Sequence, residues 1–379
     1  MDFSFTDEQE RIREAIAKLC ARFGDDYWLQ RDTDAAFPAD FHQALAKDGW
    51  LGVAMPEEFG GSGLGITEAA VMMQAIAESG AGFSGASAVH MNIFGLNPVV
   101  VFGTQEQKER MLRPLIAGKQ RACFAVTEPD TGLNTRNLKV KAERKGSRYV
   151  VSGQKVWIST AQVAEKVLLL ARAEKGLTLF YTDLDRKHVE VREIHKMGRH
   201  AVDSNQVFFD ALPVPEEDRI GEEGRGFEYI LHGMNPERIL IGAELVGLGR
   251  CAVNRASAYA KERIVFDRPI GKNQAIQHPL AANWMALEAA NLMAFKAASL
   301  YDRGKPCGAE ANAAKYLAGE ACFDACQQAV MTFGGYGYAR EYHVERYLRE
   351  SFVGRIAPVS RELILCYIAE RVLGLPKSY

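Results

Sequence analysis

Along residues 1–120 the apolar positions follow the period of a helix. Ile12, Ile16 and Leu19 are separated by four and three residues, which places them on one face of an α-helix. The glycine-rich segment 59–65 interrupts this pattern and is predicted to be a loop. We therefore expect this part of the chain to form an α-helical domain.

The pattern changes between residues 121 and 225, where short runs of branched aliphatic and aromatic residues alternate with turn residues. These runs are 148–151, 155–159, 167–171, 177–184, 189–194 and 206–210. Ser152 and Gly153 stand between the first two runs and predict a tight turn there. No helix-length pattern separates most of the runs, so an antiparallel β-barrel is expected rather than a doubly wound parallel sheet.

Long helical patterns return towards the end of the chain. They cover 227–263, 274–302, 309–334 and 346–373, and they predict a four-helix bundle. The expected fold class is therefore α+β and multidomain. It comprises an N-terminal α-helical domain (1–120), a middle antiparallel β-barrel domain (121–225) and a C-terminal four-helix-bundle domain (226–379).

Composition and charge narrow the possible functions. Apolar residues make up 47% of the 379 residues, charged residues make up 25%, and the formal net charge is −2. This balance is typical of a soluble globular protein and gives no electrostatic reason to expect nucleic acid or an anionic membrane as a partner. No uninterrupted apolar run approaches the roughly 18 residues of a membrane span. The polar, acidic N-terminus is unlike a targeting signal.

Cysteine spacing and known motifs exclude further classes. The seven cysteines are scattered and include no C-x-x-C pair, which is typical of reduced thiols and predicts a cytoplasmic location. The chain contains no H-E-x-x-H, G-x-S-x-G or Walker A sequence. Two partial G-x-G-x-x-G matches end on Ile66 and Arg340 instead of glycine. We expect no metal site.

One carboxylate lies on an apolar stripe. Glu237 precedes Ile241 by four residues, and the stripe continues through Leu245 and Leu248. A carboxylate on an apolar helix face is costly unless it is paired or protonated. Two interpretations follow. Glu237 is either a first-turn residue paired with a base such as Arg238 and favoured by the helix dipole, or a catalytic base with a raised pKa.

Six segments occur in an order that resembles the acyl-CoA dehydrogenase family of flavoproteins. They are 37–65 (FPADFHQALAKDGWLGVAMPEEFGGSGLG), 122–129 (ACFAVTEP), 155–160 (KVWIST), 263–278 (RIVFDRPIGKNQAIQH), 333–338 (FGGYGY) and the final helix. The resemblance implies the same succession of helical, β-barrel and four-helix domains. It also implies FAD-dependent oxidation of an acyl-CoA thioester to the trans-2-enoyl-CoA, with electrons passing to an electron-transfer flavoprotein.

Individual positions take roles from this resemblance. Cofactor contacts are implied for Phe124, Val126, Thr127, Trp157, Ser159, Arg263, Gln274, Gly334, Gly335 and Ser360. Substrate contacts are implied for Leu133, Asn235 and Arg238. In the family, the residues that match Arg263, Gln274 and the two glycines reach the FAD of a neighbouring subunit. A homotetramer built as a dimer of dimers is therefore expected.

The resemblance also identifies a candidate base. Most family members carry the catalytic Glu just before the last helix, where this chain has Pro358. In the branch that includes isovaleryl-CoA and long-chain acyl-CoA dehydrogenases, the Glu lies at the start of the bundle's first helix, which matches Glu237. The resemblance therefore implies that Glu237 removes the α-proton while flavin N5 accepts the β-hydride.

Pro358 leaves alternatives open. The family uses the backbone N–H at this position to bind the thioester oxygen, and proline has none. A simpler interpretation places Pro358 at the first position of the last helix.

Two other functions of the protein also remain open. One is a family member with a different outcome, such as an acyl-CoA oxidase or a lyase- or desulfinase-type enzyme. The other is a flavin-bearing, DNA-associated protein without turnover.

Overall fold

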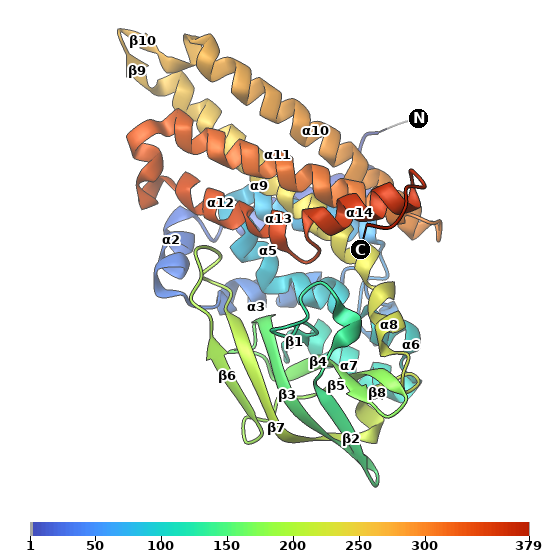
Figure 1. The fold of residues 1–379 in the computed structure, drawn as a ribbon. Helices are drawn as coiled ribbons and strands as arrows, with labels where there is room; N and C mark the ends of the chain where they lie inside the picture. The colour runs from blue at the N-terminus through green and yellow to red at the C-terminus, as the bar shows by residue number, and fades with distance from the viewer. Residues whose placement is uncertain (1–2, 379) are drawn as a thin grey trace.

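The computed structural model describes residues 3–378 and has three regions in chain order, helical, mainly β and helical again (Figure 1). The long C-terminal helices lie together at one end of the molecule, and the sheet lies at the other. The helices of the N-terminal region are α1 (Asp7–Cys20), α2 (Asp25–Asp34), α3 (Ala39–Lys47), α4 (Ile66–Ile76), α5 (Gly82–His90), α6 (Asn97–Phe102) and α7 (Gln105–Ile116). This succession is the α+β, multidomain fold that the sequence predicts.

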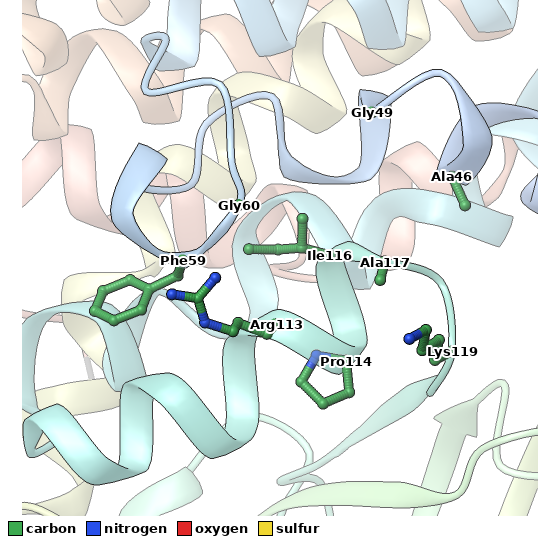
Figure 2. Close-up of a pocket in the computed structure, with 9 residues that line it drawn as sticks. All are labelled: Ala46, Gly49, Phe59, Gly60, Arg113, Pro114, Ile116, Ala117 and Lys119. Atoms are coloured by element: carbon green, nitrogen blue, oxygen red, sulfur yellow. The ribbon is translucent and has the colours of Figure 1, made fainter.

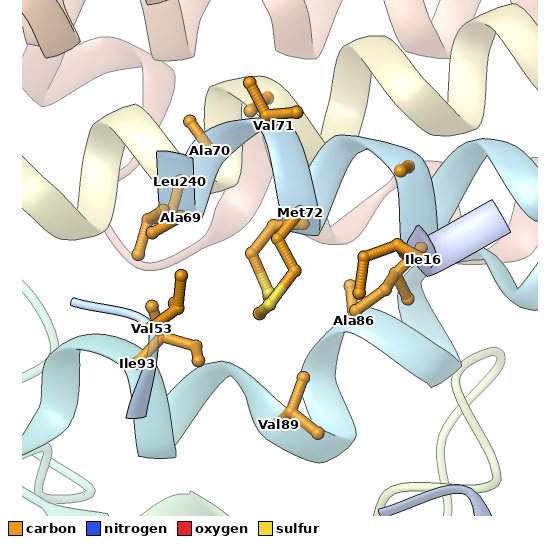
Figure 3. Close-up of a cluster of buried hydrophobic side chains, with 14 of the residues drawn as sticks. Ile16, Val53, Ala69, Ala70, Val71, Met72, Ala86, Val89, Ile93 and Leu240 are labelled. Carbon is orange, nitrogen blue, oxygen red and sulfur yellow. The ribbon is translucent and has the colours of Figure 1, made fainter. Parts of the chain in front are cut away.

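One hydrophobic cluster joins the N-terminal helices to the first long helix of the C-terminal region, α9 (Met234–Glu262) (Figure 3). Ile16 of α1, Met72 of α4, Val89 of α5 and Leu240 of α9 are all completely buried there. Burying a side chain of this size contributes roughly 1.5–3 kcal/mol. The cluster therefore holds the start of α9 firmly against α4 and α5.

The helical run Ile66–Phe102 is long and apolar enough by composition to cross a membrane. However, 67% of its most apolar window is buried inside the protein. Gly80 also interrupts the run, with a φ of +99°. Packing in the core therefore accounts for the apolar character of this segment.

The middle region is one sheet with a short partner strand. Its strands are β1 (Ala122–Ala125), β2 (Lys141–Lys145), β3 (Arg148–Ser159), β4 (Lys166–Ala173), β5 (Gly176–Asp183), β6 (Val189–Glu193), β7 (Ser204–Pro215) and β8 (Arg219–Ile220). The order is β6-β7-β3-β2-β4-β5-β8, and β1 pairs with β4 outside this path. Most neighbours are antiparallel, but β1 runs parallel to β4, and β2 meets β4 in parallel at one residue pair. The sheet is therefore mixed rather than purely antiparallel.

The tight turn predicted at Ser152 and Gly153 is wrong. Both residues lie inside β3, which continues from Arg148 to Ser159 as one strand. Its register against β7 shifts between Val151 and Gly153, and Gly153 has a φ of +138°. The glycine therefore marks a β-bulge, which bends a strand without ending it.

The C-terminal region consists of α8 (Gly226–His232), α9, α10 (Gln274–Asp302), α11 (Gly308–Phe333), α12 (Val344–Ser351), α13 (Val353–Ile356) and α14 (Arg361–Arg371). A short hairpin, β9 (Ile264–Val265) and β10 (Arg268–Pro269), joins α9 to α10. In Figure 1 the helices α9, α10 and α11 run side by side, with α12 to α14 next to α11.

Two of the predicted long helices are broken. The helix predicted over 227–263 divides at Gly233 into α8 and α9. The helix predicted over 346–373 divides into three. It is interrupted at Phe352 and again after Ile356, where Ala357 precedes a proline and is extended, with φ −132° and ψ 161°. Pro358 is therefore not the first residue of the last helix. Ser360 caps that helix, which begins at Arg361.

Candidate active site

Glu237 lies in the first turn of α9 with its carboxylate inside the protein. The residue is 7% exposed, and its Oε2 is buried without a hydrogen-bond partner among residues 3–378. Burial raises the pKa of Glu237 to about 7, although the positive charges of His90 and Arg238 lower it. A buried carboxylate with a free oxygen and a pKa near neutrality can accept a proton from a bound molecule.

Arg238 does not neutralise the Glu237 carboxylate by a direct hydrogen bond. Its Nη1 donates to the carbonyl of Met234 at 3.1 Å and to Oδ1 of Asn235 at 3.4 Å. Burial lowers the pKa of Arg238, and its Nε has no partner among the described residues. The structure therefore does not show the first-turn pairing of Glu237 with Arg238 that the sequence left open.

A second acidic residue of α9 is paired with a histidine of α5. Oε1 of Glu244 lies 2.6 Å from Nδ1 of His90, and the exposed fractions of the two side chains are 0% and 13%. The His90 ring packs against Phe94 at 4.7 Å between centroids, and Phe94 lies 6.3 Å from the ring of Phe124. These contacts connect the surroundings of Glu237 to the strand predicted to meet the cofactor.

Arg199 connects the same interior to the sheet. Its guanidinium donates to the hydroxyls of Ser87 on α5, Ser159 on β3 and Ser204 on β7, at 3.1, 3.0 and 3.3 Å. Ser87 and His90 are three residues apart and share one face of α5. The predicted cofactor residue Ser159 therefore lies within two hydrogen bonds of the helix that carries His90.

Two predicted cofactor segments lie side by side. Val156 N–H donates to the carbonyl of Thr127 at 3.0 Å. In the adjacent residues, Nζ of the buried Lys155 donates to the carbonyl of Val126 at 2.8 Å and to Oε1 of Glu128 at 2.9 Å. These bonds fix the end of β1 against β3, so the ACFAVTEP and KVWIST segments form a single surface.

Trp157 is displayed on that surface in an unusual conformation. Its φ is +61°, which few residues other than glycine adopt, and the register of β3 shifts between Lys155 and Ile158. The indole is 59% exposed. Backbone strain of this kind clusters at functional sites. The structure thus presents a large aromatic face beside Thr127 and Ser159.

A separate group of predicted cofactor residues lines a pocket of about 510 Å³ at the far end of α9. The lining residues are Tyr259, Arg263, Val265, Ile270, Thr332, Phe333, Gly334, Gly335 and Tyr336. The Arg263 guanidinium lies 5.6 Å from the centre of the Tyr336 ring. A methyl group at Gly334 or Gly335 would meet no atom within 4 Å, so a bound molecule can approach the backbone closely there.

The other predicted site residues occupy more varied positions. Gln274 is the exposed first residue of α10 and is not among the residues that line this pocket. The Ser360 hydroxyl is already used to cap α14, since it accepts from Leu363 N–H at 3.3 Å. Leu133 is 64% exposed in the loop after β1. Asn235 lies on α9, two residues before Glu237.

Another pocket carries none of the predicted site residues (Figure 2). It has a volume of about 380 Å³ and is lined by Ala46, Gly49, Phe59, Gly60, Arg113, Pro114, Ile116, Ala117 and Lys119. The Arg113 side chain is already paired with Glu109 and with the carbonyl of Glu58. The lining contains no acidic residue, and we assign it no chemistry.

Sequence reasoning missed His90, Glu244 and Arg199. Glu244 could have been found, because it falls seven residues after Glu237 on the same face of the apolar stripe. His90 and Arg199 give no local signal. Glu244 is 154 residues from His90, and two of the three Arg199 partners, Ser159 and Ser87, are 40 and 112 residues distant. In residues 3–378 no group of three or more potential ligands could hold a metal ion.

Comparisons with known proteins cover almost the entire chain. Residues 6–119, 123–212 and 224–373 match the models described as the N-terminal, middle and C-terminal domains of acyl-CoA dehydrogenase. The acyl-CoA dehydrogenase FadE12 of Mycobacterium tuberculosis is 37% identical over 392 residues, covering 100% of both chains.

Two solved structures share the fold. One, the butyryl-CoA dehydrogenase of Megasphaera elsdenii, has a TM-score of 0.94 and 28% identity, covering 98% of this chain and 100% of its own. The other, an FAD complex of PigA, has a TM-score of 0.94 and 25% identity, covering 99% of this chain and 100% of its own.

Proposed function

Because the chain belongs to the acyl-CoA dehydrogenase family, we propose that it converts an acyl-CoA to the trans-2-enoyl-CoA with Glu237 as the base. The protein is an oxidoreductase that acts on acyl-CoA and binds FAD. The observation that carries the proposal is the buried Glu237 carboxylate with an unpartnered Oε2. Its position at the start of the bundle's first long helix also matches one branch of the family.

Removing a proton from the carbon next to a thioester requires a base in a water-poor site. A general base works best when its pKa lies near the working pH, and burial raises the pKa of Glu237 to about 7. The proton transfer also requires donors that stabilise the negative charge developing on the thioester oxygen. Pro358 has no N–H to give, so in this chain that stabilisation comes from another donor.

The described residues fit FAD at both predicted places. Trp157 offers an exposed aromatic face beside Thr127, and Arg263 with the open backbone at Gly334 and Gly335 suits a pyrophosphate. When bound, FAD supplies the acceptor for the hydride that leaves the β-carbon. The role of this chain's Thr127, Trp157 and Ser159 is to hold the flavin ring.

We further propose a homotetramer, a dimer of dimers, in which the pocket at Arg263 receives the cofactor of a neighbouring subunit. Large apolar side chains are exposed on α10 and on the β9–β10 turn. Trp284 and Met285 are 54% and 59% exposed, and Phe266 is 93% exposed. Exposed apolar residues that gather on one element are typical of a subunit interface.

An electron-transfer flavoprotein is the proposed electron acceptor, as the family resemblance implies. The seven cysteines are all free, and six of them are buried. Free thiols support a reducing compartment, and we propose a cytoplasmic location.

Replacing Glu237 with Gln tests the proposal. The amide has almost the same shape but cannot accept the proton, so the variant is expected to keep its FAD and its yellow colour. Under anaerobic conditions, a panel of acyl-CoA thioesters that bleaches the wild-type flavin is expected to leave the flavin of this variant oxidised. Undiminished bleaching of the variant would exclude Glu237 as the base.

A further inference from the structure

The polar groups beside Glu237 form a small cluster inside the protein. Glu244 lies two helical turns after Glu237 on α9, so the two carboxylates share a face of that helix. His90, the last residue of α5, is in contact with Glu244, with 2.6 Å between Nδ1 and Oε1. The ion pair therefore joins α5 to the helix that carries the proposed base.

Three atoms of this cluster lack hydrogen-bond partners within residues 3–378. They are Nε2 of His90, Oε2 of Glu244 and Oε2 of Glu237, and all three are buried. Leaving a buried polar atom unpaired costs roughly 1–3 kcal/mol, more when it is charged. A pair kept only for stability would be expected to satisfy these atoms, and apolar residues would fill the same space at lower cost.

Opposite effects determine the charge of His90. Burial lowers its pKa, but the neighbouring Glu244 carboxylate raises it, and the balance leaves the pKa of His90 above its usual value. Arg199, in the loop between β6 and β7, lowers the pKa of His90 through its positive charge. The Glu244 carboxylate is therefore the main group that favours the protonated imidazole.

The charged groups that act on Glu237 come from several helices. His90 of α5 has the largest favourable effect on the ionised carboxylate, followed by Arg238 on α9 itself, while Lys315 of α11 adds a smaller one. Glu244 acts in the opposite sense. Arg238 and Lys315 are already engaged with backbone carbonyls, whereas Nε2 of His90 has no partner in the described part of the chain.

We propose that His90 and Glu244 form a positioning pair for the base: protonated His90 is the counter-charge that favours the ionised form of Glu237 in a water-poor interior, and Glu244 favours the protonated form of His90. This inference depends on the proposed function, because it assigns a role through Glu237. The pair acts on Glu237 through its charges and takes no proton from the substrate.

Variants of the pair have distinct expected effects. In His90→Gln, Glu237 loses its counter-charge and keeps the Glu244 carboxyl as a neighbour. The acidic limb of the pH profile of flavin reduction is therefore expected to move to higher pH by about one unit or more. Below that limb, a shift of one unit lowers the rate about tenfold at a given pH.

Glu244→Gln removes the negative charge that repels the Glu237 carboxylate, and it also removes the group that favours protonated His90. The acidic limb of this variant is therefore expected to move in the same direction as that of His90→Gln, but by a smaller amount. The double variant His90→Gln/Glu244→Gln is expected to match Glu244→Gln, because in both the interior loses the same two charges. This double variant removes both members of the His90–Glu244 pair together, so it can be measured even if His90→Gln folds poorly.

The experiment is anaerobic stopped-flow reduction by a reactive acyl-CoA across a range of pH. A second measurement is independent of turnover. The infrared band of the protonated Glu237 carboxyl, identified by subtracting the Glu237→Gln spectrum, is followed against pH in the FAD-loaded protein without substrate. The midpoint of this titration is expected to shift most in His90→Gln and less, by equal amounts, in Glu244→Gln and the double variant. His195→Gln, on an exposed loop of the β region, serves as the control.

The outcomes separate the two proposals. If Glu237→Gln retains reduction by acyl-CoA, the proposed function fails. If Glu237→Gln is inactive but the acidic limb and the carboxyl band of the double variant and of His90→Gln coincide with those of the wild type, the pair is only structural and this inference is overturned. A limb that moves equally in His195→Gln would likewise overturn it.

Discussion

Lys155 and Glu128 form an ion pair of 2.9 Å in which the two side chains are 0% and 5% exposed. Glu128 also accepts from the backbone N–H groups of Lys139 and Val140, at 2.6 and 3.0 Å. Lys155 in turn holds the carbonyl of Val126. One buried pair therefore fixes both cofactor segments of the β region in relation to each other.

Replacing Lys155 with Met is expected to destabilise the protein by roughly 3–5 kcal/mol, because it leaves the Glu128 carboxylate buried without its counter-charge. The double variant Lys155→Met/Glu128→Gln should lose less, since the amide is neutral and still accepts from the backbone. Urea unfolding measures both. The exposed pair Lys139–Asp130 gives the control, and Lys139→Met should change the free energy of unfolding far less than Lys155→Met. Equal losses in the single and double variants would contradict this explanation.

The raised pKa of Glu237 makes a prediction about stability. Burial raises this pKa from 4.5 to about 7 in the folded protein, so the folded state binds more protons than the unfolded state between these values. The contribution of Glu237 to stability is therefore complete below pH 4.5 and is lost as the pH rises through 7.

Replacement of Glu237 with Gln removes this dependence. The free energy of unfolding of the variant relative to the wild type should increase from pH 4.5 to pH 8 by an amount on the order of 3 kcal/mol. Thermal or urea unfolding at a series of pH values checks the sign. A difference that stays constant or falls over this range would show that the carboxylate is not protonated by burial.

Filling the pocket at Gly335 should prevent FAD binding without harming the fold. A Cβ at this position meets no atom within 4 Å, so Gly335→Val is expected to leave the thermal stability of the FAD-free protein unchanged. Its branched side chain would occupy space next to Arg263 that the pyrophosphate needs. The ratio of flavin to protein absorbance measures the loss. Gly24→Val, at another open glycine that does not line this pocket, should retain FAD fully.

The β9–β10 turn offers a test of assembly. Phe266 is 93% exposed and has a φ of +51°, a backbone conformation that asparagine tolerates well. Phe266→Asn should therefore keep the shape of the turn while removing its apolar surface. Light scattering is expected to show a smaller average assembly than for the wild type. An unchanged mass at micromolar concentration would argue against a role for this turn in the proposed interface.

Local pattern predicts elements well where one rule dominates. Residues 274–302 are helical from the first predicted residue to the last, with Asn273 at the N-cap position. The period could not show that Pro358 and the extended Ala357 divide the last helix. The dipeptide at Ser152 and Gly153 gives the same local signal for a bulge as for a turn, and only its pairing with β7 decides between them.

The candidate site was only partly accessible from the sequence. The placement of Glu237 inside the protein follows from its spacing to the apolar stripe, and the structure confirms that it is buried. Its partnership was not predictable, because His90 and Glu244 meet across 154 residues and their contact depends on how α5 packs on α9. Residues that act through long-range contacts carry no signature in local sequence.

The 29-residue helix α9 carries Glu237 in its first turn and Tyr259 near its other end, where Tyr259 lines the pocket with Arg263. At 1.5 Å per residue these two positions are roughly 33 Å apart on one continuous rod. In the proposed assembly, a single helix therefore carries the base of one catalytic centre and also lines the pocket for the cofactor of the neighbouring subunit.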